Sequence, residues 1–319
     1  MPVLLFPGQG SQAPKMGEFL YQNFQIAKDT FTEASEAIGL DLAKLCFEGS
    51  ESELSLTENT QPAILCVSIA TFRVLKNETN LTIQAGAGHS IGEYAALVSA
   101  GTLPFSSAMK AVRTRGQAMQ SSVPVGEGGM IAVLGLDSEQ IKWLCQWTEK
   151  ESGYSPISPA NFNSPGQIVV SGSSKCLQWL KENFKPDLIP GAPKRAKLIP
   201  LNVSAPFHCQ LMKPAQEKMA QVLDQIPFRN PTFPIIQNFR AQLVDDPIEL
   251  KSNLISQVSA PVLWTQTMEL MLNKGFTTGI ECGHGQVLKG LFKKMDAEQF
   301  RIYSTQNSED LNLIKNNLS

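Results

Sequence analysis

The segment Gly88–Glu93, with the sequence Gly-His-Ser-Ile-Gly-Glu, places Ser90 between two glycines. It follows the apolar run 81–87 and precedes the alanine-rich run 94–100, which favour a strand and a helix. A strand, a sharp turn and a helix in that order form a nucleophile elbow, which exposes the serine hydroxyl at the turn. Free N–H groups at the start of the helix face negative charge that develops there. We therefore predict that Ser90 is a nucleophile; the alternative is a glycine-rich turn with an incidental serine.

Strands and helices alternate along the N-terminal part of the chain. A short buried strand is expected at 2–6, followed by helices within 19–38, 61–75 and 104–120. Pro62 stands at the opening of the second of these helical stretches, where a proline is tolerated. Alternation of this kind predicts a mostly parallel sheet.

The pattern changes after the glycine-rich segment 125–129. The stretch that follows predicts strands and helices in the order β-α-β-β-α-β, which is typical of a ferredoxin-like unit. Its strands are expected at 130–136, 160–163, 167–172 and 196–203, and its helices at 138–149 and 175–184. We predict an α/β protein with a large domain of residues 1–125 and 201–319 and an inserted ferredoxin-like domain of residues 126–200. The cleft between two such domains is a favoured ligand site.

Composition argues against several classes of protein. The 319 residues carry a net charge of −2, so no strong preference for nucleic acid or an anionic membrane is visible. No apolar stretch approaches about 20 residues, and the N-terminus lacks the basic start of a signal peptide. The six cysteines form no C-x-x-C pair, and the three histidines fit no zinc spacing. We expect a cytoplasmic protein with free thiols, no bound metal, and a polar, peripheral tail beyond Ser304.

A serine hydroxyl needs a nearby base to act at neutral pH, and histidine is the usual one. The chain has three, which are His89, His208 and His284. At an elbow the side chain of His89 diverges from Ser90, so we expect it to support the site from behind. His284, in a glycine turn after a strand, lies either near the site or at a helix cap. We predict that His208 is the base; a hydrogen-bonded loop histidine is the alternative. No acidic residue stands out as its orienting group, so a backbone carbonyl can hold the imidazole instead.

The helix expected at 104–120 carries an arginine on its apolar face. Arg115 follows Val112 by three positions and Ala111 by four, on the same stripe as these apolar residues. Arg113 points about 200° away from Arg115 around the helix axis, at roughly 100° per residue, and should face water. A guanidinium on an apolar face needs an anion. Either a structural salt bridge or a substrate carboxylate meets this need, and a carboxylate suits the bidentate geometry of arginine.

The loop after the first strand has the sequence Gly8-Gln-Gly-Ser-Gln-Ala13. Its glycine spacing resembles a dinucleotide fingerprint, which also needs a second strand ending in an acidic residue about 20 positions later. Here the segment 24–38 is predicted to be helical, and Asp29 lies inside it. We therefore predict no nicotinamide cofactor. We expect a tight loop whose N–H groups complete an oxyanion hole beside the elbow.

Six ordered segments carry a resemblance to a known family. They are Phe6–Gln12, Asn59–Ala63, Gly88–Ala95, Arg115–Gly116, Asn161–Gln167 and Ala205–Cys209. In this order, and over almost the whole chain, they resemble the malonyl-CoA:acyl carrier protein transacylases. The resemblance implies an α/β-hydrolase-like large domain with a parallel sheet and a ferredoxin-like insert.

The resemblance also implies a reaction, the transfer of malonyl from malonyl-CoA to the phosphopantetheine thiol of acyl carrier protein in fatty acid biosynthesis. Ser90, activated by His208, attacks the thioester in a ping-pong mechanism, and malonyl-CoA is a substrate, so no cofactor is expected. The N–H groups of Gln9 and Ile91 hold the oxyanion. Arg115 pairs with the free carboxylate of the malonyl-serine intermediate.

Four further expectations come from the resemblance. Gln61 and Asn161 line the pocket. His208 donates to a main-chain carbonyl near Leu263. Phe207 accompanies the use of malonyl rather than methylmalonyl groups, because its ring occupies the space of a methyl branch, and selection of one methyl is worth about 1–3 kcal/mol. Packing at the domain seam is the alternative role of this ring.

The sequence leaves the partners and the activity partly open. The basic cluster Lys194, Arg195 and Lys197 meets the phosphates of coenzyme A or the acidic carrier protein, or else faces only solvent. The activity is stand-alone malonyl transfer for fatty acid synthesis, trans-acting transfer for a polyketide synthase, or release of acyl groups by a serine hydrolase. A non-catalytic acyl-binding protein is a further class. We expect a monomer that binds neither nucleic acid nor membrane.

Overall fold

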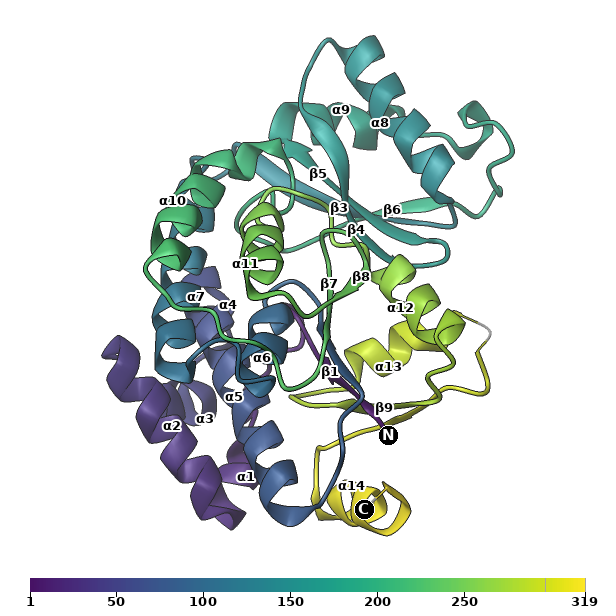
Figure 1. Cartoon of the computed structure of the whole chain (residues 1–319). Helices are drawn as coiled ribbons and strands as arrows, with labels where there is room; N and C mark the ends of the chain where they lie inside the picture. The colour runs from purple at the N-terminus through teal and green to yellow at the C-terminus, as the bar shows by residue number, and fades with distance from the viewer. Residues whose placement is uncertain (296, 319) are drawn as a thin grey trace.

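The computed structural model describes every residue of the chain except 296 and 319, and it contains two β-sheets (Figure 1). The six-stranded sheet has the order β10-β9-β1-β2-β7-β8. Its strands are β1 (Val3–Phe6), β2 (Ala85–Gly88), β7 (Ile235–Gln237), β8 (Gln242–Val244), β9 (Thr278–Glu281) and β10 (Arg301–Tyr303). All neighbouring pairs are parallel except β7 with β8, so the prediction of a mostly parallel sheet is confirmed.

Helices lie on both sides of this sheet, some directly against it and others packed on those helices. They are α1 (Glu18–Asn23), α2 (Gln25–Ile38), α3 (Leu42–Glu48), α4 (Glu51–Ser55), α5 (Thr57–Glu78), α6 (Gly92–Ser99), α7 (Phe105–Ser121), α10 (Lys213–Asp224), α11 (Pro247–Ser256), α12 (Trp264–Asn273), α13 (Val287–Phe292) and α14 (Ser308–Leu318). Successive side chains of a strand point to opposite faces. In β1, Leu4 and Phe6 join the core under α5, α6 and α7, whereas Val3 and Leu5 join the core under α12 and α13. A strand buried on both faces therefore reads as a continuous apolar run.

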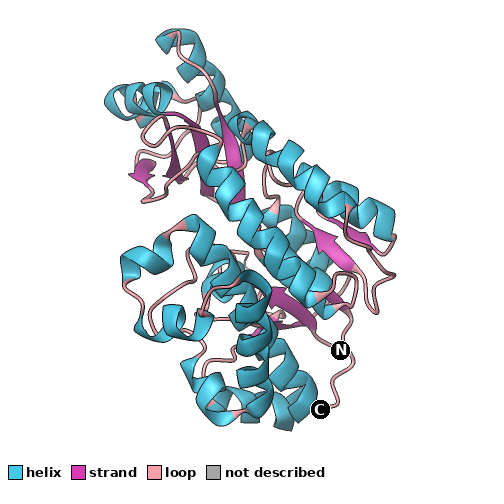
Figure 2. Ribbon diagram, turned by 90° about the vertical axis from the view of Figure 1, so that its left-hand side faces the viewer, coloured by secondary structure: helices cyan, strands magenta, loops and turns pink. Residues whose placement is uncertain are grey.

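The second sheet is antiparallel and has the order β4-β5-β3-β6. Its elements follow one another as β3 (Gly128–Leu134), α8 (Ser138–Ser152), β4 (Ile157–Ser164), β5 (Gln167–Ser173), α9 (Ser174–Asn183) and β6 (Lys197–Pro200). This is the predicted ferredoxin-like succession, and the strand limits differ from the expected ones by a few residues. Figure 2 shows this sheet and its helices at one end of the molecule.

The small sheet also has two buried faces. In β3, Ile131 and Val133 pack in the core with α8 and α9, whereas Met130 and Ala132 belong to the core of the large sheet. Successive side chains of the strand point to opposite faces, so one face of the small sheet packs on α8 and α9 and the other on the core of the large sheet. The limits 126–200 for an inserted domain stay a prediction.

Helix α5 begins at Thr57, so Pro62 lies inside the helix and the expected opening at residue 61 is wrong. A proline has no N–H to donate to the carbonyl four residues earlier, which here belongs to Glu58. Arg113 supplies the missing donor, because its Nη1 lies 2.6 Å from Glu58 O and 2.6 Å from Asn59 Oδ1. Arg113, predicted to face water, is partly exposed and also bonds to the N-terminal part of α5.

The C-terminal tail is more structured than its polarity predicts. Helix α14 buries Leu311 and Ile314 against the large core, although most of its other residues are polar. Two apolar residues at positions i and i+3 form a narrow stripe that is enough to dock a short helix.

Candidate active site

The predicted nucleophile elbow is present between β2 and α6. Ser90 has a φ of 52°, in the left-handed region that non-glycine residues rarely adopt. A Cβ added to Gly88 would lie 2.0 Å from the carbonyl carbon of Gly92, and one added to Gly92 would lie 2.2 Å from Phe6 O. Both positions therefore require glycine, because the backbone of the turn passes directly against the strand end and against β1.

Ser90 and His208 meet although they are far apart in the sequence. Ser90 Oγ lies 2.7 Å from His208 Nε2, and both residues are buried. His208 Nδ1 lies 3.0 Å from the main-chain oxygen of Gln257. We assign the proton to Nδ1, which donates to this carbonyl and leaves Nε2 free to accept the serine proton. The expected carbonyl acceptor is thus present, but it belongs to Gln257 and lies six positions before Leu263.

The environment of His208 favours the neutral imidazole. Burial first and the nearby Arg115 cation second lower the pKa of His208 to about 3, against the opposing hydrogen bond to Gln257. A histidine with a lowered pKa stays unprotonated over the whole physiological range, so it is available as a base.

Arg115 is 1% exposed and lies beside the nucleophile. Its Nη2 donates to Ser90 Oγ and to Gln257 Oε1, each at 3.0 Å, and its Nη1 donates to Gln61 Oε1 at 2.8 Å. No described carboxylate forms an ion pair with it, so the alternative of a structural salt bridge is wrong. Arg115 Nε has no hydrogen-bond partner among the described residues. A buried cation held only by neutral partners leaves its charge available to an anion.

These groups open into a cavity of 350 Å³ between the two sheets. The predicted residues that line it are Gln9, Gln61, Ser90, Arg115, Asn161, Phe207 and His208. The side chain of Ile91 instead lies in the core at 1% exposure, so only its backbone can take part. Neither the N–H of Gln9 nor that of Ile91 has an acceptor in the described part of the chain. Two free donors near the nucleophile fit an oxyanion hole.

The other two histidines do not contact Ser90 Oγ. His89 Nε2 lies 2.8 Å from Asn163 Oδ1, and its ring packs on Trp264 at 5.6 Å. This bond joins the elbow to β4, as a supporting role requires. His284 is half-buried and does not line the cavity.

Sequence reasoning missed three buried polar side chains whose hydrogen bonds hold the backbone of the elbow. Gln257 Nε2 donates to Ser90 O at 3.0 Å, and Asn238 Oδ1 accepts from the Ser90 N–H. Glu93 Oε2 accepts in turn from the Asn238 N–H. Asn238 directly follows the buried strand β7, which is the one sequence signal that places a polar group at this edge of the sheet.

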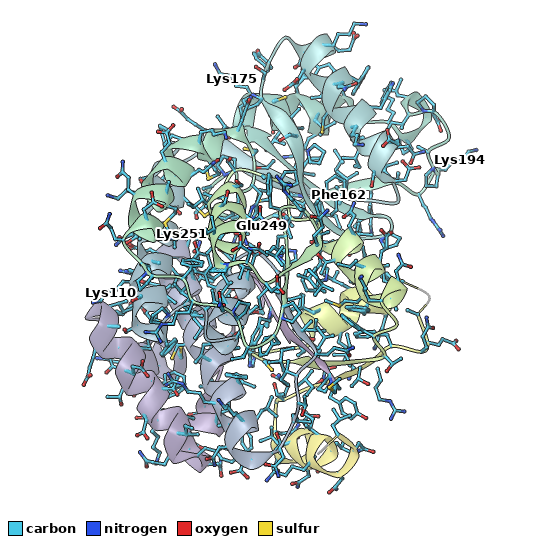
Figure 3. All side chains as sticks on the ribbon, viewed as in Figure 1. Lys110, Phe162, Lys175, Lys194, Glu249 and Lys251 are labelled. Carbon is cyan, nitrogen blue, oxygen red and sulfur yellow. The ribbon has the colours of Figure 1, made fainter. Side chains whose placement is uncertain are left out.

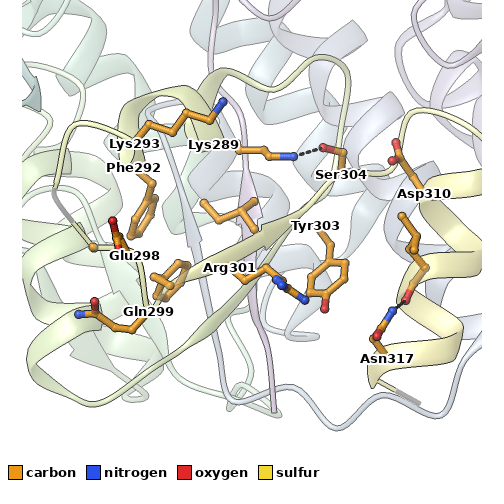
Figure 4. A pocket seen from close by; sticks show the side chains of 14 residues that line it. Lys289, Phe292, Lys293, Glu298, Gln299, Arg301, Tyr303, Ser304, Asp310 and Asn317 are labelled. Atoms are coloured by element: carbon orange, nitrogen blue, oxygen red, sulfur yellow. Dashed lines mark hydrogen bonds between the residues drawn. The ribbon is translucent and has the colours of Figure 1, made fainter.

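A larger hollow of 990 Å³ lies between α13, β10 and α14 (Figure 4). It is lined by Lys289, Lys293, Arg301, Tyr303 and Asp310, among others, and by none of the predicted site residues. The exposed cluster Lys194, Arg195 and Lys197 lies at the rim of the small sheet, and Figure 3 shows Lys194 pointing away from the protein body.

The described residues contain neither a candidate metal cluster nor a candidate membrane span. No group of three or more histidine, cysteine, aspartate or glutamate side chains there is arranged to hold a metal ion. Among the helices of that same part, none combines the length and the apolar character that a membrane span needs.

Comparison with known proteins assigns the family. The acyl transferase domain matches residues 3–311 of the chain. The malonyl CoA-acyl carrier protein transacylase of Bacillus subtilis is 44% identical over 92% of this chain and 90% of its own length. This chain belongs to the malonyl CoA-acyl carrier protein transacylase family. The Escherichia coli transacylase is 40% identical over 92% of both chains.

Solved structures of this transacylase family share the fold. The transacylase from Coxiella burnetii covers 100% of this chain with a TM-score of 0.93 at 36% identity, and 98% of that chain is matched. A malonyl-transacylase solved in complex with a type II polyketide synthase acyl-carrier protein matches 99% of both chains with a TM-score of 0.91 at 37% identity.

Proposed function

We propose that this acyltransferase moves the malonyl group from malonyl-CoA to the phosphopantetheine thiol of acyl carrier protein, as a step of fatty acid biosynthesis. The observation that carries the proposal is Arg115, a buried cation without a carboxylate partner that lies 3.0 Å from the Ser90 hydroxyl. An acyl group on Ser90 that carries its own carboxylate one methylene beyond the ester supplies the missing anion. A malonyl group has this structure, whereas an acetyl group does not.

The first half of the reaction acylates Ser90. His208 Nε2, 2.7 Å away, takes the hydroxyl proton as Oγ attacks the thioester carbonyl. The N–H groups of Gln9 and Ile91 stabilise the oxyanion, an interaction worth on the order of 10²–10³ in rate for each donor. The C–S bond then breaks, and the imidazolium of His208 returns its proton to the coenzyme A thiolate.

The second half returns the enzyme to its starting state. The thiol of the carrier gives its proton to His208 and attacks the malonyl-serine ester. The same donors hold the second oxyanion, and the leaving Ser90 oxygen recovers the proton from His208. This ping-pong order needs only one base and one oxyanion hole, because both half-reactions pass through the same tetrahedral geometry.

The cavity also supports a preference for malonyl. The ring of Phe207 and the side chains of Gln61 and Asn161 line the space around Ser90. Gln61 accepts from Arg115 Nη1 at 2.8 Å, which fixes the guanidinium plane for a bidentate carboxylate. We assign Phe207 to the exclusion of a methyl branch.

The remaining parts of the proposal concern partners and setting. The exposed cluster Lys194, Arg195 and Lys197 offers positive charge to coenzyme A phosphates and to an acidic carrier protein. We further propose that the enzyme works as a cytoplasmic monomer without a cofactor and binds no nucleic acid, and that residues 126–200 form an inserted domain. The complex of a related malonyl-transacylase with an acyl-carrier protein supports the carrier as a partner.

Transfer and hydrolysis are distinguished by their products. Incubation with malonyl-CoA and holo-carrier should give malonyl-carrier, detected by mass spectrometry, and Ser90→Ala should abolish it. Free malonate without malonyl-carrier would establish a serine hydrolase instead. A comparison of fatty-acid and polyketide carriers as acceptors tests the polyketide alternative.

A further inference from the structure

Asn238 binds the nucleophile elbow on both sides of its turn. Its side chain is fully buried. Oδ1 accepts a hydrogen bond from the Ser90 N–H at 2.6 Å, and Nδ2 donates to Gly88 O at 2.6 Å. We call these two bonds the elbow clamp. They join the last residue of β2 to the nucleophile across the intervening His89.

The elbow needs such a clamp because the Ser90 N–H has no backbone acceptor among the described residues. With a φ of 52°, Ser90 follows neither the strand before it nor the helix after it. Its N–H therefore pairs with neither the sheet nor α6. A buried N–H or C=O without a partner costs free energy, and a left-handed serine is itself unfavourable. The clamp satisfies the Ser90 N–H and the Gly88 carbonyl in the left-handed conformation of Ser90.

An amide is the side-chain type that fits this position. The site presents one donor, the Ser90 N–H, and one acceptor, Gly88 O, and a carboxamide offers one atom of each kind at the same end. A carboxylate would set a charged oxygen against Gly88 O. An apolar side chain would leave both backbone groups unpaired.

Asn238 is itself held by Glu93, which is also fully buried. Glu93 Oε2 accepts from the Asn238 N–H at 2.7 Å, and Oε1 accepts from Gln237 Nε2 at 3.0 Å. The Leu263 N–H donates to Asn238 O at 3.1 Å. The backbone of Asn238 is thus fixed on both sides, so its side chain has a defined direction towards the turn.

We propose that Asn238 is a positioning residue for malonyl transfer, with Glu93 as its support. The clamp takes up the N–H of Ser90 and leaves the next N–H, that of Ile91, free to face the oxyanion. It also keeps Ser90 Oγ at hydrogen-bond distance from His208. This inference rests on the proposed function, because it assigns a role in forming the malonyl-serine.

The first test compares Asn238→Ala with Asn253→Ala. Asn253 is buried in the same polar network and donates to Gln237 Oε1 at 2.9 Å, but no bond joins it to the elbow. We expect Asn238→Ala to slow single-turnover acylation by on the order of 10²-fold, as for a misplaced oxyanion donor. Binding of malonyl-CoA, measured in the Ser90→Ala background, should stay unchanged. Asn253→Ala should acylate at close to the parent rate.

The second test is Asn238→Asp, which separates the clamp from a loss of stability. The neutral acid form has an acceptor oxygen and a donor hydroxyl, so it can remake both bonds, whereas the carboxylate cannot. Burial raises the pKa of the new carboxyl group, and so does the neighbouring Glu93 while it is charged. Burial also raises the pKa of Glu93 to about 7, so the parent enzyme, which carries the same Glu93, is measured at each pH. We expect the acylation deficit of Asn238→Asp relative to the parent to shrink as the pH falls from about 8 to about 5.5, because more of the new side chain is then the neutral acid. His208 stays neutral over this range, so the base does not change.

The possible results separate the clamp from the proposed function. Equal acylation rates for Asn238→Ala and Asn253→Ala, or a deficit of Asn238→Asp that does not change with pH, would overturn the clamp and leave malonyl transfer standing. A parent enzyme that forms no malonyl-Ser90 adduct would overturn both.

Discussion

Replacing Arg115 with alanine removes a cation that is 1% exposed and lies 3.0 Å from the nucleophilic oxygen. Removing one partner of a buried ion pair costs about 3–5 kcal/mol, because the charge of the other partner, here the malonyl carboxylate, is left uncompensated. At about 1.4 kcal/mol for each factor of ten, kcat/KM for malonyl-CoA should fall by roughly two to three and a half orders of magnitude.

Acetyl-CoA carries no carboxylate, so Arg115→Ala should affect it much less. The residual effect comes from the lost hydrogen bond to Ser90 Oγ, and a neutral or charge-assisted bond of this kind contributes about 1–3 kcal/mol. The ratio of kcat/KM for malonyl-CoA to that for acetyl-CoA should therefore collapse. The release of free coenzyme A, followed with each substrate in the presence of holo-carrier, measures this ratio directly.

Arg113→Ala is the matched control, because Arg113 lies on the same helix and pairs with Glu58 outside the cavity. Arg113→Ala should lower the free energy of unfolding, because the Glu58 carbonyl loses its donor. It should leave the ratio of kcat/KM for malonyl-CoA to that for acetyl-CoA at the parent value. An unaltered ratio in Arg115→Ala would refute the carboxylate role of this residue.

Three further predictions follow from the site geometry. Because the pKa of His208 is lowered to about 3, the base stays unprotonated further into acid than an ordinary histidine; acylation should be flat from about pH 8 to about pH 5, and a loss with a midpoint near 6.5 would contradict the neutral buried base. Gly92→Ala sets a Cβ 2.2 Å from Phe6 O and should lower Tm and abolish acylation, whereas Gly290→Ala, with nothing within 4 Å, should gain about 0.5–1 kcal/mol in a thermal unfolding assay. Phe207→Ala should raise kcat/KM for methylmalonyl-CoA relative to malonyl-CoA by about 10–200-fold, and no change in this ratio would leave the ring with a packing role only.

The parts of the site that the sequence predicts are those set by local pattern. The elbow needs glycine at positions 88 and 92, and both stand within a few residues of Ser90. The burial of Arg115 follows from helical periodicity alone, since it shares a stripe with Ala111 and Val112. The local pattern alone points to these features, although the need for glycine at position 92 arises from its contact with Phe6 in β1.

The features that sequence reasoning missed depend on contacts between distant segments. A main-chain carbonyl for His208 is expected near Leu263, but the acceptor belongs to Gln257, because a backbone acceptor leaves no mark on the side-chain sequence. Asn238 reaches Ser90 only because β7 pairs with β2 in the sheet. Pro62 sits within a helix because Arg113, from another helix, bonds the carbonyl that a proline leaves free. In each case the partner is chosen by packing, which the local pattern does not specify.

The most direct test of the account is the site of acylation itself. After a short exposure to malonyl-CoA without carrier, mass spectrometry of the digested enzyme should find one malonyl adduct, on the peptide that contains Ser90. The adduct should disappear when holo-carrier is added and malonyl-carrier forms, and it should be absent in Ser90→Ala. A malonyl adduct on any other residue, or full malonyl transfer by Ser90→Ala, would contradict the role of Ser90 as the nucleophile.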